Sequence, residues 1–240
     1  MAGLFTVPSN DLLLYDARGW NFRGWSLCLG DGIYACSGYS VSSSDISVRH
    51  YRRLSVLYAN PRMKPIQSHA ILYKKVYVDD LPPNSEYGKV LFISAWRLPY
   101  RPRADVNSRW NPQTLEGAVM FYDGDRGVRY VVGLQWVVNP WISNELRYWT
   151  SSGWRSWKTK KVNTRWHWVI FWVDFSRKRG LICFDGRCRW VKAVGEDIDW
   201  GTRSFYVFQV ETISCYPNCD LKKGFKHRAF FKRWYLRIYR

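Results

Sequence analysis

The sequence predicts an all-β protein, a two-sheet antiparallel β-sandwich of the jelly-roll type. Period-2 and continuous apolar runs dominate its 240 residues and are bounded by Gly, Pro, Asn and Asp. Helical patterns are weak nearly everywhere. Aromatic residues make up 18% of the chain, with 15 Trp and 16 Tyr, and such side chains suit pleated, half-buried surfaces.

The predicted strands are separated by turn signals, as is typical of a sandwich or barrel. In chain order they are Leu54–Ala59, Ala70–Val78, Lys89–Trp96, Gly117–Tyr122, Val128–Val138, Glu145–Thr150, Arg165–Phe175, Arg179–Phe184, Arg187–Val191, Ser204–Glu211 and Arg233–Tyr239. In Arg165–Phe175 and Ser204–Glu211 both alternating faces are apolar. Each of these two is therefore predicted to be a central strand covered on both sides.

The domain organisation is predicted to be simple, because no internal repeat and no long linker divides the chain. We expect a single β-sandwich domain over residues 1–240. Residues 1–50 are richer in Gly and Ser and are predicted to form loops and short strands that wrap the main body. Arg97–Thr114 is irregular and contains three prolines. Long loops in compact domains are usually functional or disordered.

Six cysteines fall into three close pairs, Cys28/Cys36, Cys183/Cys188 and Cys215/Cys219. Asp185-Gly186 inside the middle pair is a strong hairpin signal, and it places Cys183 opposite Cys188 at about 4.5 Å between Cα atoms, within disulfide reach. Zinc would require C-x2-C knuckles or nearby His. Structural disulfides are therefore favoured over a metal site.

The chain is strongly basic, with a net charge of +18 and a pI near 9.8. Such a surface attracts nucleic acid, acidic glycans and anionic membranes, although it is equally compatible with a merely soluble basic protein. No run approaches 18 apolar residues. Met1 to Asp16 lacks the features of a signal peptide. Cysteine pairs without an export signal favour a virion or the cytoplasm of a hyperthermophile.

A family resemblance begins at Trp166 and covers roughly residues 85–240. The residues that carry it are Trp166-His167-Trp168-Val169, then Asp174, then Leu181-Ile182-Cys183-Phe184-Asp185-Gly186, and finally Leu236-Arg237-Ile238-Tyr239. This pattern resembles the concanavalin A-like lectin/glucanase superfamily, particularly laminin-G-type modules. The resemblance implies a jelly roll that holds sugar or protein ligands on its concave face or rim loops. The Trp, Tyr and Arg-rich style with local cysteine pairs also resembles orphan proteins of viruses of hyperthermophilic archaea.

The sequence gives only weak evidence for catalytic residues. Glucanases of this superfamily carry E-x-D-x-E on one strand, whereas the nearest stretch here is Glu196-Asp197-Ile198-Asp199-Trp200, predicted to be a solvated loop or strand end. Asp123-Gly124-Asp125 could bind Ca²⁺ but is predicted to be a hairpin tip. His50, His69, His167 and His227 show no companion pattern, and His167 is predicted to be a satisfied core residue. We assign no catalytic residue, cofactor or metal.

Two regions remain as candidate ligand sites. The first mixes arginines with rings and comprises Arg97, Tyr100, Arg101, Arg103, Arg109 and Trp110. The second is Trp-rich and comprises Trp141, Trp149, Trp154, Arg155 and Trp157. Edge packing of a Trp-rich sandwich is the alternative for both regions.

The sequence therefore favours a non-catalytic binding or structural module. Its expected ligand is a neutral or acidic glycan, in a virion or at a cell surface, with other protein subunits as further partners. One alternative is a basic protein that binds nucleic acid non-specifically. Another is a glycan-active enzyme with a degenerate glucanase-like site.

Overall fold

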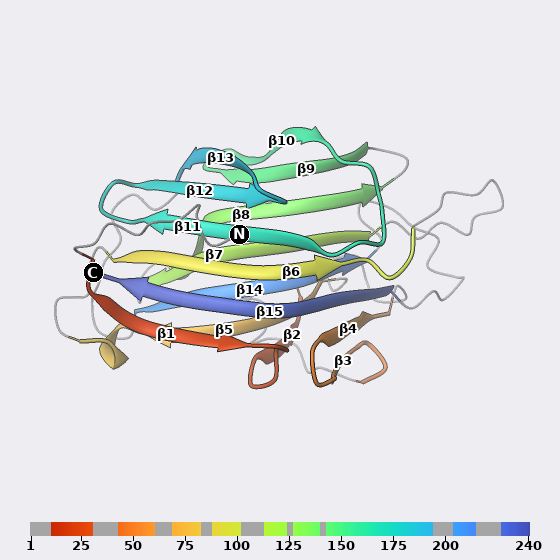
Figure 1. The fold of residues 1–240 in the computed structure, drawn as a ribbon, viewed down its shortest axis with the longest axis horizontal. Helices are drawn as coiled ribbons and strands as arrows, with labels where there is room; N and C mark the ends of the chain where they lie inside the picture. Colours follow the sequence, from red (N-terminus) through yellow and green to blue (C-terminus); the bar gives the residue numbers. More distant parts are fainter. Residues whose placement is uncertain are drawn as a thin grey trace.

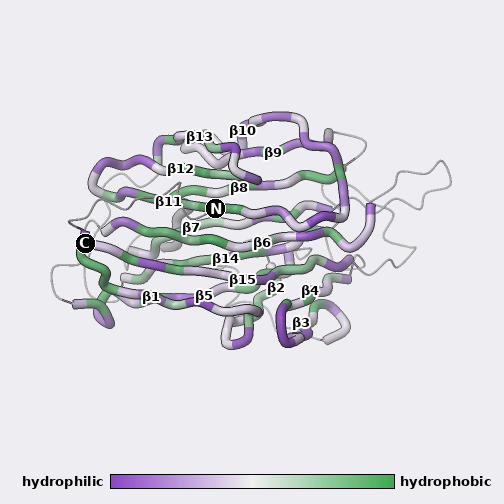
Figure 2. Tube along the Cα trace, in the orientation of Figure 1, coloured by the Kyte–Doolittle hydropathy of each residue, from purple (hydrophilic) through white to green (hydrophobic). Residues whose placement is uncertain are grey.

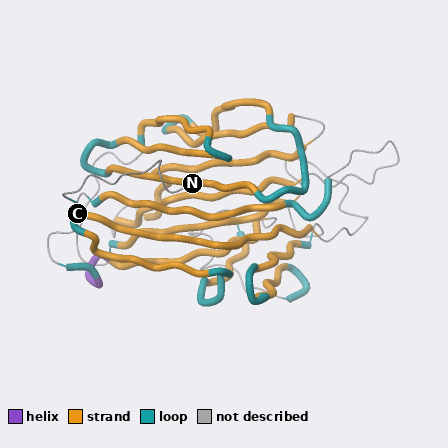
Figure 3. The backbone as a smooth tube through the Cα atoms, in the orientation of Figure 1, coloured by secondary structure: helices purple, strands orange, loops and turns teal. Residues whose placement is uncertain are grey.

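The computed structural model describes residues 11–30, 43–60, 69–82, 88–101, 113–123, 127–139, 143–193, 204–214 and 227–240. They form two antiparallel β-sheets packed face to face (Figure 1). Strand accounts for most of what is drawn in Figure 3, and the helical element within these ranges is a 3-10 turn, η3, at Val78–Asp80. The predicted all-β sandwich is confirmed.

Each sheet interleaves strands from distant parts of the chain, which is the jelly-roll arrangement. The first sheet contains, in spatial order, β13 (Arg187–Lys192), β12 (Arg179–Phe184), β11 (His167–Asp174), β6 (Lys89–Arg97), β15 (His227–Tyr239), β4 (Ser55–Ala59) and β3 (Ile46–His50), with β1 (Leu13–Gly19) paired to β15. The second sheet contains β10 (Gly153–Thr159), β9 (Ser143–Thr150), β8 (Gly127–Asn139), β7 (Gln113–Asp123), β14 (Phe205–Ser214), β5 (His69–Tyr77) and β2 (Ser26–Leu29).

The hydrophobic core lies between the two sheets and is rich in aromatic rings. Phe92 of β6 stacks on Phe171 of β11 at 5.9 Å between ring centres and meets Phe208 of β14 edge-on at 5.7 Å. All three are fully buried. Large rings fill the gap of about 10 Å that separates packed sheets. Figure 2 shows hydrophobic stretches along central strands such as β6 and a hydrophilic connection between β10 and β11.

Every predicted strand is present, but several are longer than predicted. β7 begins at Gln113 rather than Gly117, β14 continues to Ser214, and β15 begins at His227. Four strands were not predicted individually: β1, β2, β3 and β10. The first three come from residues 1–50, and they join the sheets by pairing with β15, β5 and β4.

The prediction that β11 is covered on both faces is wrong. Val169 and Phe171 are buried in the core, whereas Trp168, Ile170 and Trp172 on the opposite face are half-exposed. The strand is central within the first sheet, between β12 and β6, but its apolar outer face lies on the outside of the sandwich. For β14 the prediction is confirmed, because all of its residues are buried.

The β12–β13 hairpin forms as predicted. Asp185 and Gly186 have φ angles of 52° and 77°, the left-handed pair that a type I′ turn requires. A disulfide joins Cys183 to Cys188, whose Cα atoms lie 4.0 Å apart. Cys28 is also disulfide-bonded. Cys36, Cys215 and Cys219 lie outside the described residues, so the other two pairings stay predictions.

Candidate functional site

The outer face of the second sheet, turned away from the core, carries a row of polar side chains. Phe208 and Val210 of β14 belong to the core, and strand alternation therefore turns Glu211 to the opposite face. The pairing of β14, β7, β8 and β9 then places Glu211, Glu116, Gln135 and Arg147 directly beside one another. We call these four residues the polar row.

Two carboxyl groups meet at the centre of the polar row. Glu116 and Glu211 are cross-strand neighbours, and each is at most 1% exposed. The Tyr130 hydroxyl donates to Glu116 Oε1 at 2.8 Å, and Gln135 Nε2 donates to Oε2 at 2.7 Å. His69 Nδ1 lies 3.3 Å from Glu211 Oε2.

The pKa of Glu116 is raised well above its usual value. Burial is the largest cause, followed by the charge of Glu211 and a hydrogen bond with it, and together these outweigh the hydrogen bonds from Gln135 and Tyr130. Glu116 therefore keeps its proton at pH values where an ordinary carboxyl group has lost it, and it can donate this proton to Glu211. A neutral acid held against a carboxylate in this way is suited to positioning neighbours or to proton transfer.

An aromatic cluster adjoins the polar row on the same face. Tyr130 of β8 lies 4.8 Å from Trp149 of β9 and 6.0 Å from Trp154 of β10, and the two indoles meet edge-on at 5.3 Å, measured between ring centres. All three side chains are half-buried. The lack of a side chain at Gly133 leaves space for these rings, because a Cβ there would lie 2.9 Å from Trp154 Cη2. We call these three rings the aromatic platform.

Hydrogen bonds tie the aromatic platform to the polar row. The Tyr130 hydroxyl donates to Glu116 and accepts from Gln209 Nε2 at 3.4 Å. At the outer end of the row, Glu145 accepts hydrogen bonds from Arg147 Nε and Ser156 Oγ. The buried polar groups thus hold the Tyr130 ring in place. The Glu145–Arg147 ion pair places one negative and one positive charge at the edge of the platform.

Of the predicted Trp-rich site, the structure brings together Trp149 and Trp154. Trp157 instead packs against the core, because it lies three residues after Trp154 and strand alternation turns positions three apart to opposite faces. Arg155 is exposed, and its guanidinium donates to Ser152 Oγ at 3.1 Å. Trp141 lies outside the described residues.

The predicted arginine and aromatic loop does not join the platform in its described part. Arg97 ends β6 in the first sheet, with its guanidinium 6.0 Å from the Trp166 ring centre and 5.9 Å from that of Phe230. The Tyr100 hydroxyl donates to Gln113, and burial raises its pKa. Arg101 is exposed. The remaining predicted residues, Arg103, Arg109 and Trp110, fall in a range that the structure does not describe, as do Asp125, Asp197 and Asp199.

Glu116, Glu211, Gln135 and Tyr130 were not among the site residues predicted from the sequence. A usable signal was present for the two acids, since each interrupts an apolar strand, and a charged residue buried in a sheet is normally paired. Within the described ranges, no group of three His, Cys, Asp or Glu residues could hold a metal ion.

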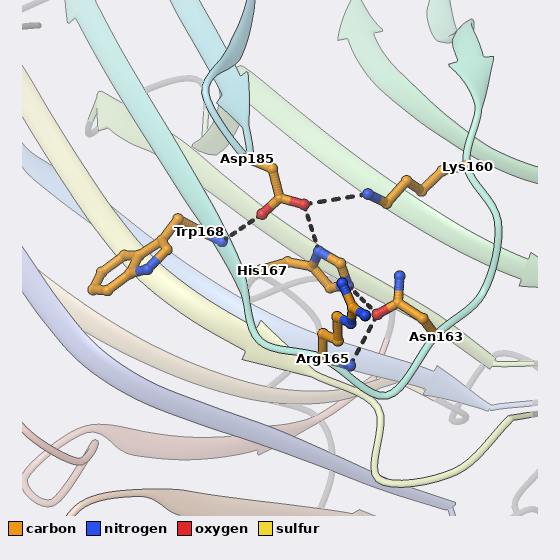
Figure 4. A network of polar contacts seen from close by, with 6 residues as sticks. All are labelled: Lys160, Asn163, Arg165, His167, Trp168 and Asp185. Carbon is orange, nitrogen blue, oxygen red and sulfur yellow. Dashed lines mark hydrogen bonds and ion pairs between the residues drawn. The ribbon is translucent and has the colours of Figure 1, made fainter. Parts of the chain in front are cut away.

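His167 belongs to a separate polar network at the β12–β13 turn (Figure 4). The ring is 3% exposed; Nδ1 lies 2.6 Å from Asp185 Oδ2, and Nε2 lies 2.9 Å from Asn163 Oδ1. The Arg165 N–H also donates to Asn163 Oδ1, and both ring nitrogens of His167 have a hydrogen-bond partner. His167 is thus the satisfied core residue that the sequence predicted.

Replacing Asp185 by Asn is expected to lower the free energy of unfolding by about 1 kcal/mol near neutral pH. A fully buried charged hydrogen bond would contribute more, but the Asp185 carboxylate is 35% exposed and is screened by solvent. Burial, the largest influence, would raise the pKa of Asp185, but hydrogen bonds and charge from His167, with Lys160 and the Trp168 N–H, lower it. This stabilisation is present above the ordinary carboxyl pKa and is lost as the pH falls through the lowered value. Urea unfolding at neutral and strongly acidic pH measures it.

Asn suits the left-handed turn position, so Asp185→Asn tests charge rather than turn geometry. Asp80→Asn, at an exposed carboxylate, is the matched control and is expected to change little. A loss for Asp185→Asn that is equally large at both pH values would contradict the prediction.

Comparisons with known proteins show the fold and no family. No family model and no curated protein matches the sequence. Similar solved structures include the CBM2 module of the evolved Dit of Lactobacillus casei BL23 phage J-1 (TM-score 0.51, 8% identity, 95% of each chain covered) and alginate lyase A1-II′ of polysaccharide lyase family 7 (0.50, 13%, 88% of this chain and 93% of that one). Lectin II from Ulex europaeus also matches (0.46, 10%, 93% and 98%). Across the ranges described, no helix is long and apolar enough to span a membrane.

Proposed function

We propose that this protein binds a glycan on the outer face of the second sheet, without acting on it. The observation that carries the proposal is the aromatic platform: Tyr130, Trp149 and Trp154 lie together on one face, each half-buried, and Gly133 leaves room for them. A ring face can lie flat on the C–H bonds of a sugar, and Tyr and Trp combine an apolar body with a polar group.

Polar groups beside the platform suit the hydroxyl groups of a sugar. Arg147, Glu145 and Ser156 stand at its edge. A sugar hydroxyl group both donates and accepts hydrogen bonds, so it can pair with the guanidinium, the carboxylate and the hydroxyl of these three side chains.

The structural comparisons favour the same class of ligand. The alginate lyase acts on a polysaccharide, as its name states, and the phage module is named as a CBM2 module. Both share the jelly-roll fold with this chain at TM-scores of 0.50 and 0.51.

A glycan-active enzyme is the second candidate, favoured by the Glu116–Glu211 pair. A carboxyl group that keeps its proton near neutral pH is what a general acid requires, and the pKa of Glu116 is raised in this way by burial and by Glu211. However, both side chains are at most 1% exposed, so a substrate would not reach them as they lie here. Binding without catalysis therefore fits the geometry better.

Trp154→Ala and Trp149→Ala are each expected to weaken glycan binding about tenfold or more, because each removes one ring from the contact surface. The measurement is calorimetry or glycan-array binding with neutral, uronate-containing and sulfated glycans. Tyr130→Phe, which keeps the ring and loses the hydroxyl, is expected to have a smaller effect.

Trp190→Ala is the matched control, since Trp190 is 58% exposed and lies on β13 of the first sheet. Equal binding by wild type, Trp154→Ala and Trp149→Ala would refute the proposed site. Release of shortened glycan by the wild type that is abolished in Glu116→Gln would establish the enzyme instead.

A further inference from the structure

The outer face of β15 alternates cationic and aromatic side chains. Five of its side chains face away from the core, in chain order Arg228, Phe230, Lys232, Tyr235 and Arg237. The order is thus cation, ring, cation, ring, cation at successive outward positions. The one extra residue between Lys232 and Tyr235 comes from a bulge, where the register with β6 shifts and Arg233 takes a φ of 50°.

Beside this bulge lies a hollow of about 380 Å³, lined by Arg18, Gly19, Trp20, Arg233 and Tyr235. Its volume falls in the range of small-molecule sites. Trp20 is 53% exposed, and the Arg233 guanidinium lies 4.3 Å from the centre of its ring. We call this hollow the Trp20 pocket.

Backbone contacts hold the Trp20 pocket in shape. The Arg233 N–H donates to the Trp20 carbonyl at 3.0 Å, and Trp234 Nε1 donates to the Asn21 carbonyl at 2.6 Å. Gly19 lets the two segments approach, because a Cβ there would lie 2.7 Å from Trp234 Nε1. A non-glycine residue in the left-handed region persists only where its surroundings fix it, and such positions cluster at functional sites.

The lining of the pocket combines positive charge with aromatic rings. Arg18 and Arg233 line it, none of the lining residues that the structure describes is acidic, and the nearby Asp16 carboxylate lies 3.3 Å from Arg237. Guanidinium groups bind phosphate in a bidentate manner, while the exposed indole and the Tyr235 ring offer flat faces for a base. Cationic grooves with interleaved aromatic rings are the usual means of binding single-stranded nucleic acid.

We propose that the outer face of β15 and the Trp20 pocket bind single-stranded nucleic acid, with one nucleotide in the pocket. Its base stacks on Trp20 and its phosphate lies between Arg18 and Arg233. This site is on the first sheet, on the opposite side of the sandwich from the aromatic platform, so it goes beyond the glycan site and does not depend on it. The net charge of +18 accelerates encounter with such a polymer.

The test is fluorescence anisotropy with a fluorescein-labelled oligothymidylate, titrated at several salt concentrations. Trp20→Ala and Arg18→Gln are each expected to weaken binding about tenfold. Arg18→Gln is also expected to lower the slope of log affinity against log salt by about 0.7, the loss of one phosphate contact on a single strand. Thermal unfolding confirms that the variants, altered at exposed side chains, remain folded.

Arg155→Gln removes the same charge at an exposed position on the second sheet, and Trp190→Ala removes an exposed indole at the far edge of the first. Both are expected to bind like the wild type.

Equal losses in Arg18→Gln and Arg155→Gln would overturn the proposal in favour of general charge attraction. Displacement of the oligonucleotide by heparin, with heparin binding itself reduced equally by Trp20→Ala, would also overturn it and assign the pocket to an anionic glycan. Trp154→Ala leaves oligonucleotide binding unchanged, which separates this result from the fate of the glycan site.

Discussion

Glu116→Gln is expected to gain stability relative to the wild type as the pH rises. Burial, the charge of Glu211 and the hydrogen bond between the two raise the pKa of Glu116 in the folded protein, whereas in the unfolded chain it is about 4.3. Between those two values the folded state keeps a proton that the unfolded state has released. The wild type therefore loses stability with rising pH across this window, by up to about 1.4 kcal/mol per pH unit.

The amide introduced by Glu116→Gln cannot titrate and escapes this loss. Its size matches the carboxyl group, and its N–H can donate to Glu211 as the protonated acid does. Only one oxygen remains to accept from Tyr130, so Gln135 must turn its own amide to accept rather than donate. That rearrangement sets the difference in unfolding free energy between the wild type and Glu116→Gln at low pH. The difference between their slopes of unfolding free energy against pH reports the ionisation of Glu116.

The measurement is the free energy of unfolding in urea at several pH values from about 4 to about 8, the window set by the unfolded carboxyl pKa. Glu145→Gln is the control, since Glu145 lies on the same face but is paired with Arg147. A difference between Glu116→Gln and wild type that stays constant with pH would show that Glu116 ionises normally in the folded state.

The fold could be predicted from the sequence because its signals are local. Alternation along one strand shows that the strand exists, and Asp185-Gly186 sets the β12–β13 pairing and its disulfide within a few residues. The proximity of Trp149 and Trp154 could likewise be predicted, because the short hairpin at Gly153 places them directly opposite each other.

Buried polar residues on β7 and β14 could be suspected from the sequence, but their assembly into the polar row could not, because its members come from strands that are distant in the chain. Glu116 and Glu211 become neighbours only through the register of β7 with β14, and a shift of one residue would turn one of them into the core. Trp157 is a different case, because strand alternation alone places it on the opposite face from Trp154, three residues earlier. It packs against the core, so grouping it with Trp154 was wrong.

Gly117→Ala is expected to destabilise the protein by about 2–3 kcal/mol, although alanine would normally stabilise a strand relative to glycine. A Cβ at this position would lie 2.4 Å from Cζ2 and 3.0 Å from Cη2 of Trp96. The Trp96 ring is fully buried, its N–H donates to Ser94 Oγ at 2.7 Å, and it meets Phe231 edge-on. It therefore has no free space into which to move, and β7 must shift instead.

Trp96→Phe provides the decisive control, because the smaller ring lacks the two atoms that the new Cβ would strike. Alone it is expected to destabilise, since it leaves a cavity and an unpaired Ser94 hydroxyl. Combined with Gly117→Ala, the total loss in urea unfolding is expected to be smaller than the sum of the two single losses by at least about 1 kcal/mol. Strict additivity would mean that β7 yields at Gly117 without pressing on Trp96.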